Sequence, residues 1–420
     1  MRWGSSNLSI RDLSIGLALG LSSAAVAQPS APPSPMVDQA TPAAWVFAFK
    51  FNAADFPTSG TLTSCLFGGT PKAYASSQKY AFAYAGSSTL RDGPGLVGTS
   101  TADPVGATFA EIYSSGLNFV VWNDQFYGHP AITGCSQSCS GPWGHSKGVI
   151  AWDDTGNGVV LQVTTPSWPG SGAAAHPRRS DGNTLGCVTD DDIKASQHFF
   201  ALKLTLSDTA AVLDALANAS VVTNLSNAQL AKIGGPPALQ QRALLLGKKS
   251  SSTNVLDTTL SSGVRLISKP SALHVPLWQL ISARLGGVPL LTATWWTTPK
   301  IPSTSANEAI SCWQSGLGKP GAITIATKGQ WEGHSLGLTG GPQLDANHAK
   351  IGVSTDRAHS YVIFGDMNQQ GALSGRCASS QNGRGGLFFV LADPALQESV
   401  ESLLGGSLAN GGGGPERGWR

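Results

Sequence analysis

Histidine and lysine occur two residues apart at two places in this chain of 420 residues, and each pair is followed at the same spacing by an aspartate. The first triplet, His145–Lys147, precedes Asp153, and the second, His348–Lys350, precedes Asp356. An imidazole can attack an electrophile or donate a proton, and an ammonium group neutralises an anion. Two matched triplets therefore predict one site for an anionic substrate, assembled from two halves of the chain.

A phosphate group suits these side chains. Residues two apart on a strand project to the same side, so each triplet can present its histidine and its lysine to one phosphate. We predict that His145 attacks the phosphorus and forms a phosphohistidine, while protonated His348 donates to the departing oxygen. The near-symmetry of the triplets leaves the reverse assignment open. Lys147 and Lys350 would neutralise the nonbridging oxygens, so we expect neither a metal nor another cofactor.

The other acidic and imidazole side chains carry weaker signals. Asp153 and Asp356 either begin turns or orient the neighbouring lysine or histidine, and the sequence does not decide between these roles. Six further histidines lack a repeated context and are expected to be structural or exposed. They are His129, His176, His198, His274, His334 and His359.

The elements around the two triplets repeat in the same order. A helical pattern at residues 107–115 and an apolar strand at 118–122 precede the first triplet. A helical pattern at residues 277–285 and an apolar strand at 288–296 precede the second. After each triplet come a hairpin, a strand that contains Phe-Phe, and a helix with an acidic cap.

This repeat predicts an α/β (α+β) fold of two related halves, each a mixed β-sheet flanked by helices. We expect the halves to pack about a pseudo-two-fold axis and to form one composite active site. The expected divisions are a signal peptide at 1–27, a flexible leader at 28–42, an N-terminal half at 43–235, a connection at 236–255, a C-terminal half at 256–405 and a flexible Gly-rich tail at 406–420.

The N-terminal residues indicate export. Arg2 and Arg11 supply positive charge before a short apolar stretch, residues 13–21, and Ala25–Ala27 has the small residues of a cleavage site. We therefore expect a secreted or periplasmic protein without a membrane partner, because no later stretch has the length of a transmembrane helix. Charged residues make up only 12% of the chain, while Gly (51) and Pro (25) are frequent, which favours a turn-rich fold over a charged, disordered chain.

Six cysteines in an exported chain indicate three disulfides. Zinc binding is the alternative, but the one close pair lacks a second cysteine or histidine pair at zinc spacing. Fifteen pairings are open to the sequence. Our interpretation keeps each bridge inside one half and pairs Cys65 with Cys187, Cys135 with Cys139, and Cys312 with Cys377.

The segments around the triplets resemble the deoxyribonuclease II family, a branch of the phospholipase D superfamily, from about Trp45 to Leu404. The matching segments are Trp122–Gln125, Gly144–Val149, Thr165–Pro169, Asn347–Lys350 and Gly365–Asn368.

The resemblance implies two phospholipase D-like halves and an acid-active, metal-independent endonuclease that leaves 3′-phosphate and 5′-hydroxyl ends. It assigns catalysis to both histidines and both lysines of the triplets. Asn368 matches a polar residue that can bind a phosphate oxygen, whereas Ser167 stands where family members often have Asn. Two alternatives stay open: a phospholipid or other phosphodiesterase that uses the same site, and a secreted nucleic-acid-binding homologue without activity.

The implied partner is DNA, with no obligatory protein partner and with a homodimer left open. The formal net charge is +2, and removal of residues 1–27 takes away two arginines and one aspartate, which leaves +1. Protonation of all eight histidines would raise this to about +9, so acid favours polyanion binding. The candidate DNA contacts are Arg178, Arg179, Lys248 and Lys249, with Trp168 and Trp295–Trp296 as stacking surfaces, although tryptophans are more often part of the core.

Overall fold

Two large sheets build the fold, and their central strands are buried on both faces. The structure is a computed structural model that describes residues 1, 31–58, 77–98, 100–114, 116–126, 132, 135, 138–169 and 192–409. The first sheet has the order β3 (Ser87–Asp92), β2 (Tyr80–Tyr84), β1 (Trp45–Lys50), β7 (Gln197–Leu204), β6 (Gly158–Val163), β5 (Lys147–Trp152), β4 (Asn118–Asn123) and β8 (Ala231–Lys232).

The second sheet repeats the central order of the first. Its order is β13 (His334–Gly337), β12 (Ile323–Trp331), β11 (Leu290–Ala293), β14 (Ile351–Ser354), β15 (Tyr361–Gly365), β16 (Gly386–Ala392), β10 (Arg265–Lys269) and β9 (Leu256–Thr259), and β17 (Ser407–Leu408) also pairs with β12. The antiparallel run β1-β7-β6-β5-β4 thus corresponds to the antiparallel run β10-β16-β15-β14-β11. This order confirms the predicted α+β class and agrees with two related halves; the pseudo-two-fold axis stays a prediction.

Helices lie in two kinds of position relative to the sheets. α1 (Pro104–Ser114) and α4 (Leu277–Arg284) each pack with the apolar residues on one face of their own sheet. α2 (Leu206–Asn218) contacts strands of both sheets, and so does α5 (Pro394–Leu404). The shared core therefore lies between the sheets, where Phe200 stacks on Phe364 with ring centroids 4.1 Å apart.

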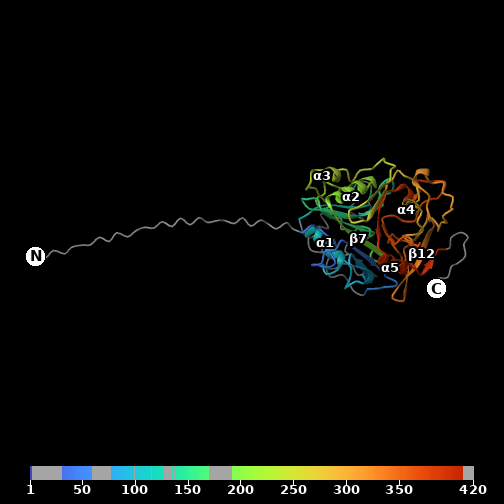
Figure 1. Cartoon of the computed structure of the whole chain (residues 1–420), viewed down its shortest axis with the longest axis horizontal. Coiled ribbons are helices and arrows are strands. Elements are labelled where there is room, and N and C mark those ends of the chain that lie inside the picture. Colours follow the sequence, from blue (N-terminus) through green and yellow to red (C-terminus); the bar gives the residue numbers. More distant parts are fainter. Residues whose placement is uncertain are drawn as a thin grey trace. The chain divides into compact units, whose positions relative to one another are not determined.

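The residues that separate β7 from β10 are packed rather than extended. α2 begins with a capping box, in which the Thr205 hydroxyl accepts from the Asp208 N–H and the Asp208 carboxylate accepts from the Thr205 N–H. α3 (Pro237–Ala243) lies within the stretch expected to connect the halves, and it packs beside α2, as Figure 1 shows in green. The turns η1 (Ser315–Leu317) and η2 (Ser380–Gly383) are short 3₁₀ helices in the C-terminal half.

The leader prediction needs a correction. Residues 31–42 are held against α1, because the Met36 N–H donates to the Thr108 hydroxyl at 3.0 Å and Met36 forms a β-bridge with Pro42. The compact unit that contains both sheets begins at Pro32. A proline-rich segment without apolar periodicity was predicted to be flexible, but backbone hydrogen bonds to its neighbours order it.

Candidate active site

Lys147 is held by a buried carboxylate from the next strand. Lys147 opens β5 opposite Asn123, the last residue of β4, and Asp124 follows directly. The Lys147 Nζ donates to Asp124 Oδ1 at 2.6 Å, and the Asp124 side chain is fully buried. Burial raises the pKa of Asp124, but the charges of Lys147, His145 and Arg384 outweigh it and hold that pKa well below its usual range. Asp124 is therefore a permanent anion in the site.

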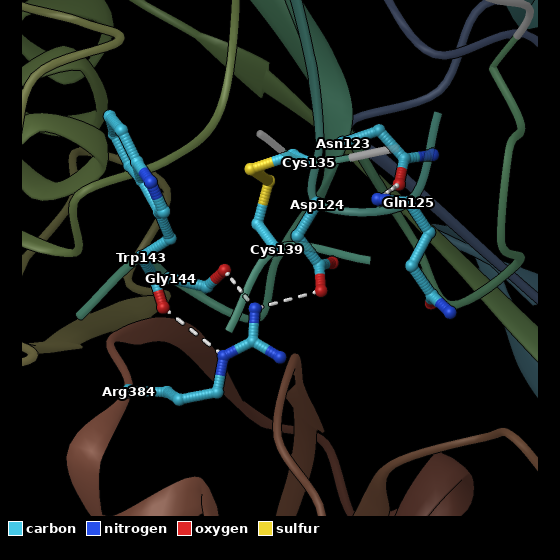
Figure 2. Close-up of a disulfide and its surroundings, with 8 residues drawn as sticks. All are labelled: Asn123, Asp124, Gln125, Cys135, Cys139, Trp143, Gly144 and Arg384. Atoms are coloured by element: carbon cyan, nitrogen blue, oxygen red, sulfur yellow. Dashed lines mark hydrogen bonds and ion pairs between the residues drawn. A yellow bond between two sulfur atoms is a disulfide. The ribbon is translucent and has the colours of Figure 1, made fainter. Parts of the chain in front are cut away.

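Arg384 reaches this carboxylate from the C-terminal half. Its Nη2 donates to Asp124 Oδ2 at 2.8 Å and to the Gly144 carbonyl at 2.7 Å, and its Nε donates to the Trp143 carbonyl at 3.1 Å. Figure 2 shows the guanidinium bridging these three groups below the Cys135–Cys139 disulfide. The arginine thus fixes the segment before His145 and one side of Asp124 at the same time.

His145 has a defined tautomer. Its Nδ1 lies 2.7 Å from the Asp366 carbonyl oxygen, which can only accept, so Nδ1 carries the hydrogen and Nε2 keeps a lone pair. Its backbone N–H donates to the Gly385 carbonyl at 2.8 Å. Burial, followed by the charge of Lys147, lowers the pKa of His145 well below its usual range.

Asp366, which directly follows β15, supports this arrangement. Its carboxyl accepts from Gln162 Nε2 at 2.9 Å and from the Leu387 N–H at 2.8 Å, and it also bonds the Ser146 side chain. Burial raises the pKa of Asp366 to about 7. At acid pH the group is therefore a neutral carboxylic acid, which both donates and accepts.

His348 is positioned by the N-terminal half. Its N–H donates to the Ser196 carbonyl at 2.7 Å, its Nε2 lies 3.1 Å from Asp192 Oδ2, and its ring meets Trp295 edge to face at 4.1 Å. Burial lowers the pKa of His348 to about 3, against the raising effect of Asp192. The two histidines therefore have unequal surroundings.

Lys350 lacks the partner that Lys147 has. Its N–H donates to His198 Nδ1 at 3.1 Å and its Nζ donates to the His348 carbonyl, but among the described residues it forms no ion pair. Trp295 lies at the end of β11 where Asp124 lies at the end of β4. Burial, followed by the charge of Lys147, lowers the pKa of Lys350 well below its usual range.

The two triplets meet in one site. Lys350 is among the charges that lower the pKa of His145, and Lys147 is among those that lower the pKa of His348. The backbone contacts are reciprocal, because each histidine N–H donates to a carbonyl that precedes a strand of the opposite sheet, Gly385 before β16 and Ser196 before β7.

Two buried lysines hold the loops that make these reciprocal contacts. The Lys50 Nζ at the end of β1 donates to the carbonyls of Ile193 and Ala195 at 2.7 and 2.6 Å. The Lys269 Nζ at the end of β10 donates to the carbonyls of Asn382 and Arg384, both at 2.8 Å. Burial lowers the pKa of Lys269 to about 7. Each ammonium group thus holds the loop through which its own half of the chain contacts the triplet of the other half.

Several predicted supporting residues lie elsewhere. Asp153 and Asp356 are at the far ends of β5 and β14, roughly 20 Å of strand from the triplets, so they do not orient the histidines or lysines. Asp153 caps its turn through Thr155, and Asp356 pairs with His359 Nδ1 at 2.9 Å. Both are turn residues.

Ser167 and Asn368 border the site in different ways. Ser167 is buried, and its hydroxyl donates to the Gln125 carbonyl at 2.9 Å, which braces the loop after Asp124. The Asn368 Nδ2 donates to Gln370 at 2.9 Å, while its buried Oδ1 has no donor within the part of the chain that the structure describes. A role for Asn368 at a phosphate stays a prediction.

The predicted DNA contacts divide into three groups. Trp168 is 1% exposed and packs against Phe109 and Phe199, so the prediction of a stacking surface was wrong for this ring. Lys248 and Lys249 are exposed, and the Lys249 ammonium lies 5.2 Å from the centre of the Trp143 ring. Arg178 and Arg179 lie outside the described residues.

Two of the three predicted disulfides are present. Cys135 bonds Cys139, and Cys312 bonds Cys377. Cys65 and Cys187 lie outside the described residues, as do residues 2–30, which hold nearly all of the predicted signal peptide, and residues 410–420 of the tail. Within the described ranges, no three His, Cys, Asp or Glu side chains are grouped as around a metal ion. Among the helices that the structure describes, none is long and apolar enough to cross a membrane.

The sequence interpretation gave no role to four side chains that complete the site. Asp124 and Asp366 lie inside segments that carry the family resemblance, so those segments were the available signal. Asp192 and Arg384 lie in loops whose partners belong to the other half, and no local pattern marks such a contact.

Paired imidazole and ammonium groups where two halves with the same strand order contact each other suit an anionic substrate such as a phosphodiester. Comparison with models of known families matches residues 68–405 to Deoxyribonuclease II. The chain belongs to the deoxyribonuclease II family and is a nuclease with DNA as its substrate. No curated protein matches the chain.

Proposed function

We propose that the protein is an acid-active, metal-independent endodeoxyribonuclease that leaves 3′-phosphate and 5′-hydroxyl ends. The observation that supports the proposal is the reciprocal contact of the two triplets: the N–H of His145 donates to Gly385 of the C-terminal half, and the N–H of His348 donates to Ser196 of the N-terminal half. Two imidazoles supply the attacking and donating groups for in-line displacement at phosphorus, and the lysines neutralise the nonbridging oxygens.

His145 is the nucleophile in this proposal. Its Nδ1–H faces the Asp366 carbonyl, and its lowered pKa keeps the imidazole neutral in mild acid, so the Nε2 lone pair is free to attack. The N–P bond forms as the P–O5′ bond breaks, and the phosphoryl group stays on the 3′ oxygen. Water then attacks the phosphohistidine, which releases the 3′-phosphate and restores His145.

His348 is the general acid. The neighbouring Asp192 carboxylate favours the imidazolium, which gives its proton to the departing 5′ oxygen and then takes one from the attacking water. This division of roles rests on the unequal partners of the two rings: a carbonyl oxygen at His145 and a carboxylate at His348.

Acid activity follows from the lowered pKa values. In the free site His348, with a pKa of about 3, gains protons as the pH falls, and so does Lys350. A bound phosphate raises both pKa values by adding a negative charge. Lower pH therefore increases the fraction of sites in which His348 and Lys350 are both charged.

We also propose that residues 1–27 direct export, which would place the enzyme outside the cell or in a periplasm. Both triplets belong to one chain, so the chemistry does not need a second subunit. A homodimer is compatible with this proposal.

The test is incubation of supercoiled plasmid near pH 5 with a chelator, followed by analysis of the ends. We expect nicking that yields 3′-phosphate and 5′-hydroxyl ends, and a loss of at least about a thousandfold in kcat for His145→Ala. His359→Ala is the matched control, because that histidine lies on the distant turn with Asp356. Absence of nicking, a requirement for metal, or 5′-phosphate ends would contradict the mechanism.

The division of labour is tested by trapping. His348→Ala should accumulate phosphohistidine on His145 with an activated substrate whose leaving group needs no proton, because deprotonation of the attacking water is slowed. Acid quench and mapping of the labelled peptide locate the phosphoryl group. Label on residue 348 in the reciprocal variant, His145→Ala, would instead assign the nucleophile to His348.

A further inference from the structure

A cleft of about 540 Å³ is lined in part by Arg384, whose guanidinium contacts Gly144, the residue before the first triplet. One wall is the segment Ser138–Pro142, next to the Cys135–Cys139 disulfide, and the other is formed by residues around η2 together with Arg384. The exposed His274 side chain also lines it. The cleft therefore lies at the junction of the two halves, and the mechanism above leaves it unused.

Arg384 brings unused hydrogen-bond donors to this cleft. Its Nε and both Nη2 hydrogens are accounted for by Trp143, Asp124 and Gly144, as Figure 2 shows. A guanidinium has five N–H donors, so the two on Nη1 remain, and they have no acceptor within the described ranges. A planar cation with two free N–H donors on one nitrogen can bind an oxygen of a phosphate.

The charge around the cleft has one sign. No acidic side chain is among the described residues that line it, and Asp124 lies behind the guanidinium, fully buried. A further cation, the Lys249 ammonium, packs over the ring of Trp143, whose carbonyl accepts from Arg384. Seryl hydroxyls of Ser138, Ser140 and Ser380 line the remaining wall. These groups donate to an anion.

Backbone contacts link the cleft wall to His145. Arg384 donates to the carbonyl of Gly144, and the N–H of His145 donates to the carbonyl of Gly385. Gly144 and His145 are adjacent in the chain, and so are Arg384 and Gly385, so these two contacts join the cleft wall to the proposed catalytic histidine. A nucleic-acid strand carries a phosphate at every nucleotide. A strand with one phosphate at His145 can thus place the next one against Arg384.

We propose that this cleft is a subsite for the phosphate next to the scissile one, bound by Arg384 Nη1 and the His274 imidazole. The proposal rests on the proposed function, since it takes His145 to mark the scissile position. It explains how the enzyme would distinguish a polynucleotide from an isolated phosphodiester: only the polynucleotide occupies both sites.

The test compares the binding of TpT, which has one phosphate, with that of TpTpT, which has two, to the His145→Ala protein at pH 5 and low salt. We expect TpTpT to bind at least about fivefold more tightly than TpT. In His145→Ala/His274→Ala this ratio of affinities should fall below about twofold. The slope of log affinity against log salt for TpTpT should fall by about 0.7 when one phosphate contact is lost. His274 is exposed, so its replacement does not disturb the core.

Two controls make the result decisive. His145→Ala/His334→Ala, which replaces an exposed histidine on β13, should keep the full difference in affinity between TpTpT and TpT. TpTpT with a neutral methylphosphonate at either linkage should bind like TpT if the cleft binds a phosphate. If this ligand kept the full affinity advantage over TpT, the cleft would bind a base instead, and the proposal would be overturned. Equal weakening of TpT and TpTpT by His274→Ala would also overturn it. Because binding is measured without turnover, absence of plasmid nicking would count against the nuclease mechanism and leave this readout intact.

Discussion

At the scale of single residues, the site is asymmetric although the motifs are matched. Lys147 is fixed by Asp124 and Arg384, whereas Lys350 has no carboxylate partner among the described residues and its pKa is lowered. Lys350 therefore gains the most from a bound phosphate, which supplies its missing counter-charge. Trp295, at the position that corresponds to Asp124, creates this difference.

Replacement of Asp192 by Asn tests the role of the general acid. The Asp192 carboxylate raises the pKa of His348, so its loss lowers that pKa further. A general acid must be protonated, and the alkaline limb of the kcat–pH profile should therefore move to lower pH by about one unit, with about a tenfold loss of rate on that limb. A pH–rate profile from pH 3 to 7 measures this shift.

Asp356→Asn is the matched control, because it removes the carboxylate of another Asp–His pair on a distant turn. Its profile should superimpose on that of the wild type. A profile of Asp192→Asn that keeps its alkaline limb would assign the proton donation to another group.

At the scale of elements, the strand ends do the positioning. β4, β5 and the loop before β16 meet at the first triplet, while β11, β14 and the loop before β7 meet at the second. The loops are long-range partners, and Lys50 and Lys269 hold them by their carbonyls. These lysines act on the site without reaching the reacting atoms.

Lys269→Met should impair catalysis from this distance. It removes hydrogen bonds to the buried carbonyls of Asn382 and Arg384, which we expect to destabilise the fold by on the order of 3 kcal/mol. It also loosens the loop that presents Arg384 to Asp124, so kcat should fall at temperatures where the variant is fully folded. Urea unfolding and steady-state kinetics on one preparation separate the two effects.

Lys203→Met, which replaces an exposed lysine near the end of β7, controls for loss of a charge. Lys50→Met should reproduce the effect through the other triplet, because Lys50 holds the loop that leads from Asp192 to Ser196. Normal kcat in a folded Lys269→Met protein would reduce that lysine to a purely structural role.

The sequence predicted the elements that depend on local pattern. The helices over 107–115 and 277–285 correspond to α1 and α4, and the strand over 118–122 corresponds to β4, because their signals are apolar periodicity and turn residues close in the chain. Asp192 and Arg384 could not be predicted, since their roles depend on how one half docks on the other. Asp153 and Asp356 were ambiguous because a following aspartate is equally typical of a turn.

At the scale of the whole molecule, the two described disulfides should contribute differently to stability. Cys312–Cys377 closes 65 residues and Cys135–Cys139 closes 4. Loop-closure entropy gives about 4 kcal/mol for the first and about 2 kcal/mol for the second. Denaturant unfolding of the double serine variants should therefore show the larger loss for Cys312→Ser/Cys377→Ser.

Activity should fall more in Cys135→Ser/Cys139→Ser than in Cys312→Ser/Cys377→Ser, which is the opposite of the order for stability. The Cys139 N–H donates to the Asp124 carbonyl at 2.8 Å, so the short disulfide fixes the backbone of the residue that holds Lys147. Nuclease assays on folded protein, with the urea midpoint as the check on folding, measure this. Equal relative activity of the two variants would contradict a role for the short bridge at the site.

The reciprocal backbone contacts have a consequence for synthesis. His145 takes its backbone acceptor from Gly385, and Asp124 takes its second cation from Arg384, both more than 200 residues later in the chain. A chain under synthesis folds its N-terminal part first, and that part carries a complete His-x-Lys triplet without the groups that complete it. The groups that complete the proposed site are therefore in place only after the last strand before α5 has been made and docked.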